Sequence, residues 1–101
     1  MSDAASMPLP LAGVRVLDLA TFLAGPFCST ILAEFGAEVI KVEQPGAGDP
    51  LRKFGTMTDS GDSLVWLQES RNKRCVTLDL KSPRGKAMLE ELVQKADVVV
   101  E

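Results

Sequence analysis

The stretch that decides the fold reads Glu38-Val39-Ile40-Lys41-Val42-Glu43-Gln44-Pro45-Gly46-Ala47-Gly48-Asp49-Pro50-Leu51-Arg52. Residues 38–43 have the apolar and β-branched content of a buried strand, and residues 45–50 form a loop rich in glycine and proline. Open α/β sheets place their ligands just beyond the carboxyl ends of such strands. The stretch therefore predicts an α/β fold and indicates a nucleotide-like ligand. On residue types alone, residues 45–50 fit a plain surface turn equally well.

The segment before this stretch predicts a strand followed by a helix. Residues 14–20, rich in Val and Leu, are the expected first strand. In the turn Ala24-Gly25-Pro26, Pro26 can take the first helical position, where a missing amide donor has no consequence. Gly36 then fits the C′ position that closes the helix, so a right-handed β-α-β unit is expected. The apolar positions of this helix, at spacings of three and four, are Phe27, Ile31, Leu32 and Phe35.

The second half of the chain predicts further strands and a second long helix. Residues 45–61 form a long irregular segment, which is usually functional, and residues 62–70 fit either a helix or a strand. Residues 75–80 alternate as a third strand, Ser82-Pro83 supplies an N-cap and a first helical residue, and residues 98–100 form a fourth strand. The helix is expected to reach Lys95, with an apolar stripe made of Met88, Leu89, Leu92, Val93 and Ala96.

This order of elements predicts an open, mostly parallel α/β sheet with helices on its faces. Residues 1–10 are expected to be a flexible lead-in. Because residues 96–101 form a strand with nothing behind it, we expect the chain to be the amino-terminal part of a longer protein. Expressed alone, such an incomplete sheet should aggregate or stay partly unfolded. The alternative is a short, non-catalytic binding remnant.

Composition excludes several classes of protein. The net charge of −3 and the lack of an extended basic run do not predict nucleic-acid binding. No secretory signal or membrane-length apolar stretch is visible, so neither membrane nor export is expected. The chain has no histidine, and Cys28 and Cys75 do not form a Cys-x-x-Cys pair, which excludes a Cys/His metal site in this segment. Both cysteines are interpreted as small core residues in a cytoplasmic protein.

Four charged features are candidates for chemistry. Asp18 lies within an apolar strand and fits either a catalytic carboxylate or, more simply, a group that caps a neighbouring loop. Lys41 and Glu43 share a strand face and are expected to offset each other's charge. Residues 71–74, Arg-Asn-Lys-Arg, precede the third strand at the end of the sheet opposite to ligand sites, which favours a solvated turn or a subunit contact. Lys81 lies at the carboxyl edge beside a helix start, where a phosphate would find a cation and amide donors, or is simply an exposed lysine.

Several segments together carry a resemblance to a known family. They are Leu11–Asp18, Ala24–Pro26, Leu32–Glu43, Pro45–Asp49, Arg71–Arg74, Leu78–Pro83 and Ala96–Glu101. In this order and spacing they closely resemble the start of class III coenzyme A transferases, the CaiB/BaiF family, which includes formyl-CoA transferase, carnitine-CoA transferase and α-methylacyl-CoA racemase. The resemblance implies that residues 11–101 are the amino-terminal part of a CoA-binding, Rossmann-like large domain in an interlocked homodimer.

The resemblance also implies a reaction. Transferases of this family move coenzyme A from an acyl-CoA to a carboxylic acid acceptor, through a covalent intermediate on an aspartate. That aspartate lies beyond Glu101 in the family, so no catalytic residue is assigned to this chain, and the fragment alone is expected to be inactive. Racemization by acid-base proton transfer is the alternative within the family. No metal is implied.

By motif position, the resemblance places several coenzyme A contacts in this chain. They are Phe22, Leu23 and Ala24 after the first strand, Gln44 after the second, and Leu78, Asp79, Leu80 and Lys81 after the third. Two positions depart from the family pattern. Gln44 replaces a common arginine and lacks its charge and bidentate fork. Leu23 replaces the glutamine of formyl-CoA transferases, so formyl specificity is not implied.

Overall fold

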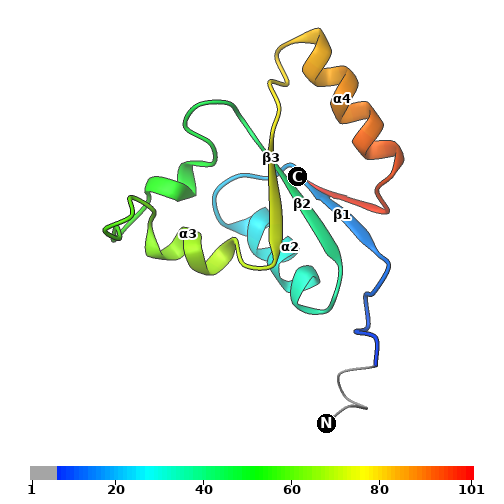
Figure 1. Cartoon of the computed structure of the whole chain (residues 1–101), viewed down its shortest axis with the longest axis horizontal. Coiled ribbons are helices and arrows are strands. Elements are labelled where there is room, and N and C mark those ends of the chain that lie inside the picture. The colour runs from blue at the N-terminus through cyan, green and yellow to red at the C-terminus, as the bar shows by residue number, and fades with distance from the viewer. Residues whose placement is uncertain (1–6) are drawn as a thin grey trace.

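The computed structural model describes residues 7–101, which form a parallel sheet flanked by helices (Figure 1). Of the expected lead-in at residues 1–10, residues 1–6 lie outside the described residues, and residues 7–10 are exposed. In chain order the elements are β1 (Arg15–Asp18), α2 (Ala24–Glu34), β2 (Glu38–Glu43), the 3-10 helix η1 (Pro50–Lys53), α3 (Leu64–Glu69), β3 (Lys73–Thr77), α4 (Pro83–Gln94) and β4 (Val98–Val100).

The four strands lie in the order β3-β2-β1-β4, and every neighbouring pair is parallel. Strands are added in one direction from β1 to β3, and the chain then crosses back to place β4 on the free side of β1. This reversal is the arrangement of a Rossmann-like sheet. The predicted α/β fold with an open parallel sheet is therefore confirmed.

The strand boundaries follow the pairing. β2 and β4 have the predicted limits, whereas β1 is shorter than residues 14–20. The third strand, predicted at residues 75–80, instead begins at Lys73 and ends at Thr77. The reason is that β3 pairs only with β2, from Val39 opposite Lys73 to Glu43 opposite Thr77, so it ends where β2 ends.

Helix α2 packs on the sheet with a face that the sequence pattern did not predict. It begins at Ala24, so Pro26 is its third residue; the first helical amides have no intrahelical acceptor, and proline is tolerated there. Its buried side chains are Pro26, Ser29, Thr30 and Ala33, while the apolar residues Phe27, Ile31 and Phe35 are exposed. Small polar residues are buried because the strands beneath present charged side chains and because Thr30 Oγ1 donates to the Glu69 carbonyl of α3.

The other end of α2 matches its prediction. Gly36 has a φ of 105° and follows the C-cap residue Phe35, and its amide donates to the Ala33 carbonyl. This is the left-handed C′ position at which glycine is favoured. The small apolar core between α2 and the sheet is built from Val16, Ala33, Ala37 and Val39.

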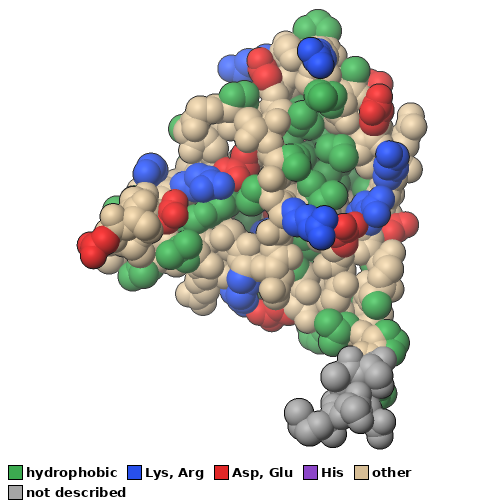
Figure 2. All heavy atoms as spheres, viewed as in Figure 1, with side chains coloured by type: hydrophobic (Ala, Val, Ile, Leu, Met, Phe, Trp, Pro, Cys, Tyr) green, Lys and Arg blue, Asp and Glu red, His purple; other side chains and the backbone are tan. Residues whose placement is uncertain are grey.

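Helix α4 begins as predicted, with the Ser82 hydroxyl accepting a hydrogen bond from the Gly85 amide. Its predicted apolar stripe, however, is only partly covered, and Met88 and Val93 are exposed. The β3-to-β4 connection crosses the sheet in the opposite direction to the β1-to-β2 connection, so a right-handed crossover places α4 on the face opposite α2. One helix is too narrow to cover four strands, and α4 stands away from them, which leaves the apolar patch visible in Figure 2.

The remaining segments also differ from expectation in places. Residues 62–70, left open as helix or strand, contain the helix α3, and the long segment before it contains η1. Cys28 and Cys75 are exposed, so the interpretation of both as core residues is wrong. Cys28 lies on the outer side of α2, and Cys75 lies on β3, at the edge of the described sheet. Within residues 7–101, no helix has the length and apolarity needed to cross a membrane.

Candidate functional site

A pocket of about 440 Å³ lies at the carboxyl ends of β1, β2 and β3. Its wall contains residues that follow each of these strands, namely Leu19, Thr21, Val42, Glu43, Gln44, Pro45, Gly48, Asp49, Pro50, Leu78, Asp79, Leu80 and Lys81. This is the edge of the sheet at which open α/β folds bind ligands. The loop at residues 45–50, which the sequence left open as surface turn or ligand loop, forms one side of it.

The predicted contact residues fall into two groups. Gln44 and the whole segment from Leu78 to Lys81 line the pocket. Phe22, Leu23 and Ala24 lie in the connection from β1 to α2 and do not line it, although their neighbour Thr21 does. Phe22 is half-buried, whereas Leu23 and Ala24 are exposed.

Among residues 7–101, Lys81 is the one Lys or Arg residue in the wall of this pocket. It is exposed and takes part in none of the ion pairs formed among residues 7–101. At the start of α4, the Ser82 hydroxyl takes the Gly85 amide and Pro83 has no amide hydrogen, so Arg84 is the first-turn residue whose amide remains beside this edge. The side chain of Lys81 is the positively charged group that the pocket wall offers to an anion.

The turn after β3 holds this lysine in place. The Asp79 carboxylate accepts a hydrogen bond from the Lys81 amide, and the Asp79 carbonyl accepts from the Ser82 hydroxyl. Gly85 packs so closely on the Asp79 carbonyl that a Cβ would overlap it. The segment from Leu78 to Lys81 is thus fixed against the first turn of α4.

The loop after β2 is built on an ion pair between Glu43 and Arg52. Arg52 donates to both carboxylate oxygens of Glu43, through Nε at 2.7 Å and Nη2 at 2.7 Å, and the Asp49 amide donates to the same carboxylate. The hydrogen bonds from Arg52 and, more weakly, from the Asp49 amide lower the pKa of Glu43 to about 2, against an opposing effect of burial. Arg52 also lies over the Trp66 ring, 4.1 Å from its centroid, which ties the loop to α3.

Contacts made by Gly48 and by Gln44 complete the loop. Gly48 has a φ of 73°, and a Cβ there would overlap the Glu43 carboxylate, so only glycine lets the chain pass this close to the ion pair. Gln44, which is exposed, donates from Nε2 to the Gly48 carbonyl at 3.1 Å. Gln44 therefore braces the loop as well as facing the pocket.

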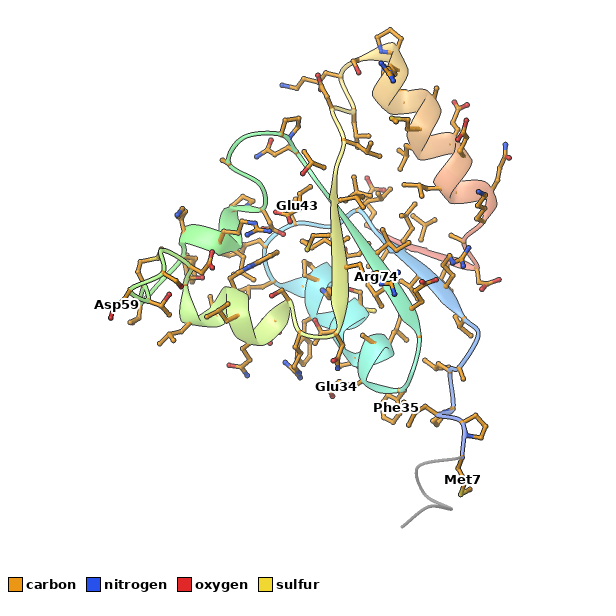
Figure 3. All side chains as sticks on the ribbon, viewed as in Figure 1. Met7, Glu34, Phe35, Glu43, Asp59 and Arg74 are labelled. Atoms are coloured by element: carbon orange, nitrogen blue, oxygen red, sulfur yellow. The ribbon has the colours of Figure 1, made fainter. Side chains whose placement is uncertain are left out.

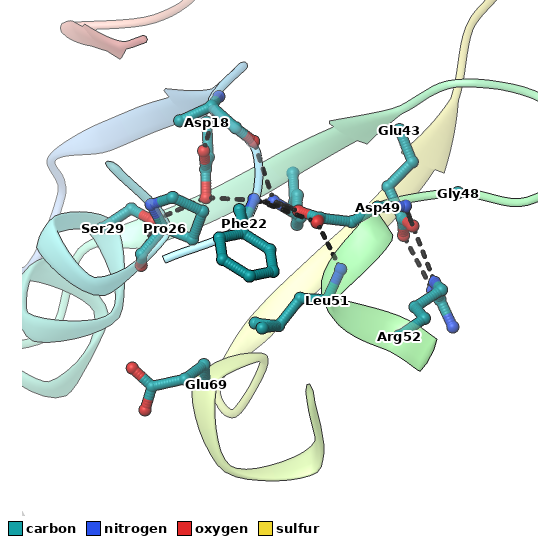
Figure 4. Close-up of polar contacts among 12 residues, drawn as sticks. Asp18, Phe22, Pro26, Ser29, Glu43, Gly48, Asp49, Leu51, Arg52 and Glu69 are labelled. Atoms are coloured by element: carbon teal, nitrogen blue, oxygen red, sulfur yellow. Dashed lines mark hydrogen bonds and ion pairs between the residues drawn. The ribbon is translucent and has the colours of Figure 1, made fainter. Parts of the chain in front are cut away.

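A second group of charges is buried between the sheet and α2 (Figure 4). Asp18 accepts hydrogen bonds from the Ala20 amide, from the Ser29 hydroxyl at 2.6 Å and from Lys73 Nζ at 3.1 Å. The simpler reading of Asp18, a carboxylate that caps a neighbouring loop, is what the structure shows. Burial is the main cause that lowers the pKa of Lys73, and the Asp18 charge opposes it.

Lys41 and Glu43 do not pair with each other, so the expectation that they offset each other's charge is wrong. Lys41 Nζ lies 2.7 Å from Asp49 Oδ2 and donates to the Ala20 carbonyl at 3.0 Å. Glu43 pairs with Arg52 instead. Both partners, Asp49 and Arg52, come from the segment after β2. The strand sequence alone therefore does not indicate these contacts.

The charged side chains of the basic segment at residues 71–74 also have different partners from one another. Lys73 is drawn into the buried group, whereas Arg74 stays exposed and lies in front of the sheet in Figure 3, within 3.9 Å of Glu38. Arg71 pairs with Glu34 of α2 and donates to the Gln68 carbonyl. Neither arginine lies at the pocket, so the interpretation against a phosphate site here agrees with their positions.

Sequence reasoning missed Thr21 and Leu19 as residues of the pocket wall, and it included Asp49 in the candidate ligand loop without giving this residue a role. Asp49 had a signal, because it ends the glycine-rich loop and precedes a proline, but its buried contacts join segments far apart in the chain. No signal distinguished Thr21. Within residues 7–101, no group of three or more His, Cys, Asp or Glu side chains is arranged to hold a metal ion.

Comparison with known proteins decides the family. The profile described as CoA-transferase family III matches residues 11–101. The chain belongs to this family. Its sequence is 57% identical over 99 residues to the beta subunit of succinyl-CoA–L-malate CoA-transferase from Chloroflexus aurantiacus, covering 98% of this chain and 24% of that protein. It is 50% identical over 97 residues to formyl-CoA:oxalate CoA-transferase from Bradyrhizobium diazoefficiens, covering 94% of this chain and 22% of that protein.

Two solved structures agree with the fold. A crystal structure of a variant of Rv3272 from Mycobacterium tuberculosis matches with a TM-score of 0.83 and 39% identity, covering 93% of this chain and 25% of that chain. A CAIB/BAIF family protein from Brucella suis matches with a TM-score of 0.81 and 37% identity, covering 92% and 25%. The chain spans about a quarter of the length of these relatives, as the amino-terminal part of the family fold.

Proposed function

We propose that the protein to which this segment belongs is a CoA transferase that moves coenzyme A from an acyl-CoA to a carboxylic acid. The observation that carries the proposal is the pocket at the carboxyl edge, whose wall includes Gln44, the Leu78–Lys81 segment and an uncompensated lysine. A wall with apolar side chains, a few polar groups and a lysine that forms no ion pair within residues 7–101 suits a nucleotide bearing phosphates. Membership of the CoA-transferase family identifies coenzyme A as the nucleotide to test first.

In this proposal residues 11–101 are the amino-terminal part of the CoA-binding domain. The contacts are Phe22, Leu23, Ala24, Gln44, Leu78, Asp79, Leu80 and Lys81. Lys81 pairs with a phosphate of the nucleotide, and Leu78 and Leu80 pack against its base, since they are the apolar side chains nearest to that cation along the chain. Phe22 to Ala24 lie beside the pocket on its β1 side, where the remainder of the coenzyme would pass.

The chemistry belongs to residues outside this segment. A carboxylate oxygen of an aspartate attacks the carbonyl carbon of the acyl-CoA, a C–O bond forms, and the C–S bond breaks with release of the CoA thiolate. The thiolate then attacks the mixed anhydride to give an enzyme thioester and frees the donor acid. The acceptor carboxylate then attacks the carbonyl carbon of the enzyme thioester and expels the CoA thiolate, which gives a second mixed anhydride. The thiolate attacks the acceptor-derived carbonyl of this anhydride, which releases the new acyl-CoA and restores the aspartate. The active protein is proposed to be a cytoplasmic homodimer.

The experiment uses the protein as its natural gene encodes it. Calorimetry should detect binding of coenzyme A and of its nucleotide half, 3′-phospho-ADP. Incubation of succinyl-CoA with a panel of isotopically labelled carboxylic acids should give labelled acyl-CoA products, and hydroxylamine should trap the acyl intermediate as a hydroxamate on the enzyme. Exchange of the proton next to the thioester carbonyl in D₂O without any transfer would indicate a racemase instead. Absence of binding to either ligand would overturn the proposal.

A further inference from the structure

The connection from β1 to α2 contains one residue in an unusual backbone conformation. Phe22 has a φ of 70°, in the left-handed region that side chains other than glycine rarely adopt. Residues held in this region persist when their surroundings fix them, and they concentrate near ligand sites. Phe22 follows Thr21, a residue of the pocket wall.

The group that fixes Phe22 is the carboxylate of Asp49. The Phe22 amide donates to Asp49 Oδ1 at 3.0 Å and lies 3.3 Å from Oδ2, as Figure 4 shows. The Phe22 ring packs edge-on against Phe54, with the centroids 4.8 Å apart. The backbone at Phe22 is thus held by the loop that follows β2 rather than by its own neighbours.

The Asp49 carboxylate is itself held rigidly. It is buried, its Oδ2 lies 2.7 Å from Lys41 Nζ, and its Oδ1 accepts a second hydrogen bond from the Leu51 amide at 2.9 Å. Lys41 also donates to the Ala20 carbonyl, so the same ion pair contacts the connection between β1 and α2 at a second residue. A buried, fully bonded carboxylate of this kind transmits its position to whatever it bonds.

These contacts join two sides of one pocket. Thr21 follows β1, and Lys81 follows β3, with β2 and the Asp49 loop between them. An extended ligand whose anionic end lies at Lys81 has to cross the Asp49 loop to reach the β1 connection. The relative placement of these two sides therefore depends on the bond between Asp49 and the Phe22 amide.

We infer that Asp49 is a positioning residue, which holds the Thr21–Leu23 segment against the pocket through the Phe22 amide so that the part of coenzyme A beyond its nucleotide can bind there. This inference rests on the proposed function. It assigns to Asp49 no contact with the ligand. It also explains why the loop after β2 contains a buried aspartate whose charge is neutralised by Lys41 of β2.

The test compares three variants in the protein as its gene encodes it. Asp49→Ala removes the acceptor for the Phe22 amide, and Asp49→Asn keeps an oxygen that can accept it. Asp97→Ala is the matched control, because the Asp97 carboxylate also accepts from a backbone amide, that of Arg15 at 2.8 Å, but at the opposite end of β1. Each variant is titrated with coenzyme A and with 3′-phospho-ADP, and amide hydrogen exchange is followed at Phe22.

Asp49→Ala is expected to weaken binding of coenzyme A about tenfold, the equivalent of one charge-assisted hydrogen bond. Binding of 3′-phospho-ADP should change less than about twofold, because Lys81 and its turn are unaffected. Exchange of the Phe22 amide should accelerate, Asp49→Asn should recover most of the affinity, and Asp97→Ala should resemble the natural protein in all three measurements.

Two results would overturn the inference while leaving the proposed function intact. One is unchanged coenzyme A affinity in Asp49→Ala, and the other is an equal loss for both ligands with no rescue by Asp49→Asn, which would indicate a merely structural residue. Failure of the natural protein to bind either ligand would overturn the proposed function, and this inference with it. The natural protein is therefore measured first.

Discussion

Lys41 and Glu43 show why charge on a buried strand is hard to interpret from neighbours in sequence. Side chains two positions apart on a strand share a face, but their Cα atoms are about 6.6 Å apart, and the strand keeps them parallel. A loop that folds over that face can bring a carboxylate or guanidinium much closer. Here Asp49 reaches Lys41 and Arg52 reaches Glu43, and each pair is nearly removed from water on one or both sides.

The low pKa of Glu43, about 2, predicts a pH dependence of stability. Because the pKa of Glu43 in the folded state lies below its usual value of 4.5, the stabilisation is fully present above about pH 4.5 and is lost as the pH falls toward 2. Each pKa unit corresponds to about 1.4 kcal/mol, and partial exposure of Arg52 reduces the effect, so we expect a loss of about 2 kcal/mol. Thermal unfolding followed over this pH range measures it.

Glu43→Gln should remove most of this dependence, since glutamine does not titrate. Glu34→Gln is the matched control, because Glu34 pairs with Arg71 on an exposed surface where ion pairs contribute little. If the natural protein and Glu43→Gln lose stability equally between pH 4.5 and 2, the Glu43–Arg52 pair is not the source of the dependence.

Lys81 gives a prediction about ligand affinity at the same scale. If its ammonium pairs with a phosphate of coenzyme A, Lys81→Ala should weaken binding about tenfold, and the remaining binding should depend less on salt. Lys86→Ala, which removes an exposed lysine one turn into α4, should leave the affinity unchanged. Calorimetric titration at two ionic strengths measures both effects. Equal affinities for Lys81→Ala and Lys86→Ala would contradict a phosphate contact at Lys81.

At the scale of the elements, local signals were predictable and long-range ones were not. The limits of β2, the C′ glycine of α2 and the Ser82 cap of α4 all depend on residues close together in sequence, and all were predicted. The orientation of α2 was not predictable from its own apolar spacing. It depends on the charged side chains Asp18 of β1 and Lys73 of β3 beneath it, which are 55 residues apart in the chain.

In the candidate site, too, some residues were predictable from the sequence and others were not. The family resemblance implied Gln44 and the segment from Leu78 to Lys81 as contacts, and the structure brings them around one pocket, whereas Phe22 to Ala24, implied in the same way, do not line it. Thr21 and Asp49 depend on how the loops after β1 and β2 fold against each other. That packing is a tertiary property, so residue types and spacing alone did not indicate it.

The two serine N-caps give a matched prediction for helix stability. Ser63 is buried, and its hydroxyl accepts from the Trp66 amide and donates to the Leu51 carbonyl at 2.7 Å. Ser82 makes similar bonds near the surface. Ser82→Ala should destabilise its helix by about 1 kcal/mol, and Ser63→Ala by about 2 kcal/mol, because the latter also removes a fully buried hydrogen bond to the Leu51 carbonyl, which keeps only the Phe54 amide as a donor.

Amide hydrogen exchange at Trp66 and Gly85 measures these two effects locally. Exchange at Trp66 in Ser63→Ala should accelerate more than exchange at Gly85 in Ser82→Ala. The reverse order would mean that the contact between Ser63 and Leu51 contributes nothing beyond the cap itself.

At the scale of the whole molecule, the chain leaves apolar surface on two sides. The outer side of α2 exposes Phe27, Ile31 and Phe35, with Phe35 at 52% exposure. The sheet and α4 expose Val76, Val99, Met88 and Val93 on the other side, where Figure 2 shows the patch. The radius of gyration, 14.8 Å, also exceeds the value of about 13 Å that is typical of a compact domain of this length.

These surfaces predict the behaviour of the 101-residue chain when it is expressed as a separate polypeptide. Contiguous exposed apolar patches promote association, and a loosely covered sheet unfolds with low cooperativity. We therefore expect broad thermal unfolding, binding of a hydrophobic dye and elution as oligomers or aggregates. Replacing Phe27 and Ile31 together by Gln should reduce association without loss of stability, because both side chains are exposed. A monomeric elution profile with a sharp thermal transition in the unmodified chain would show that these patches are tolerated in water, and that the sheet and α2 form a stable unit by themselves.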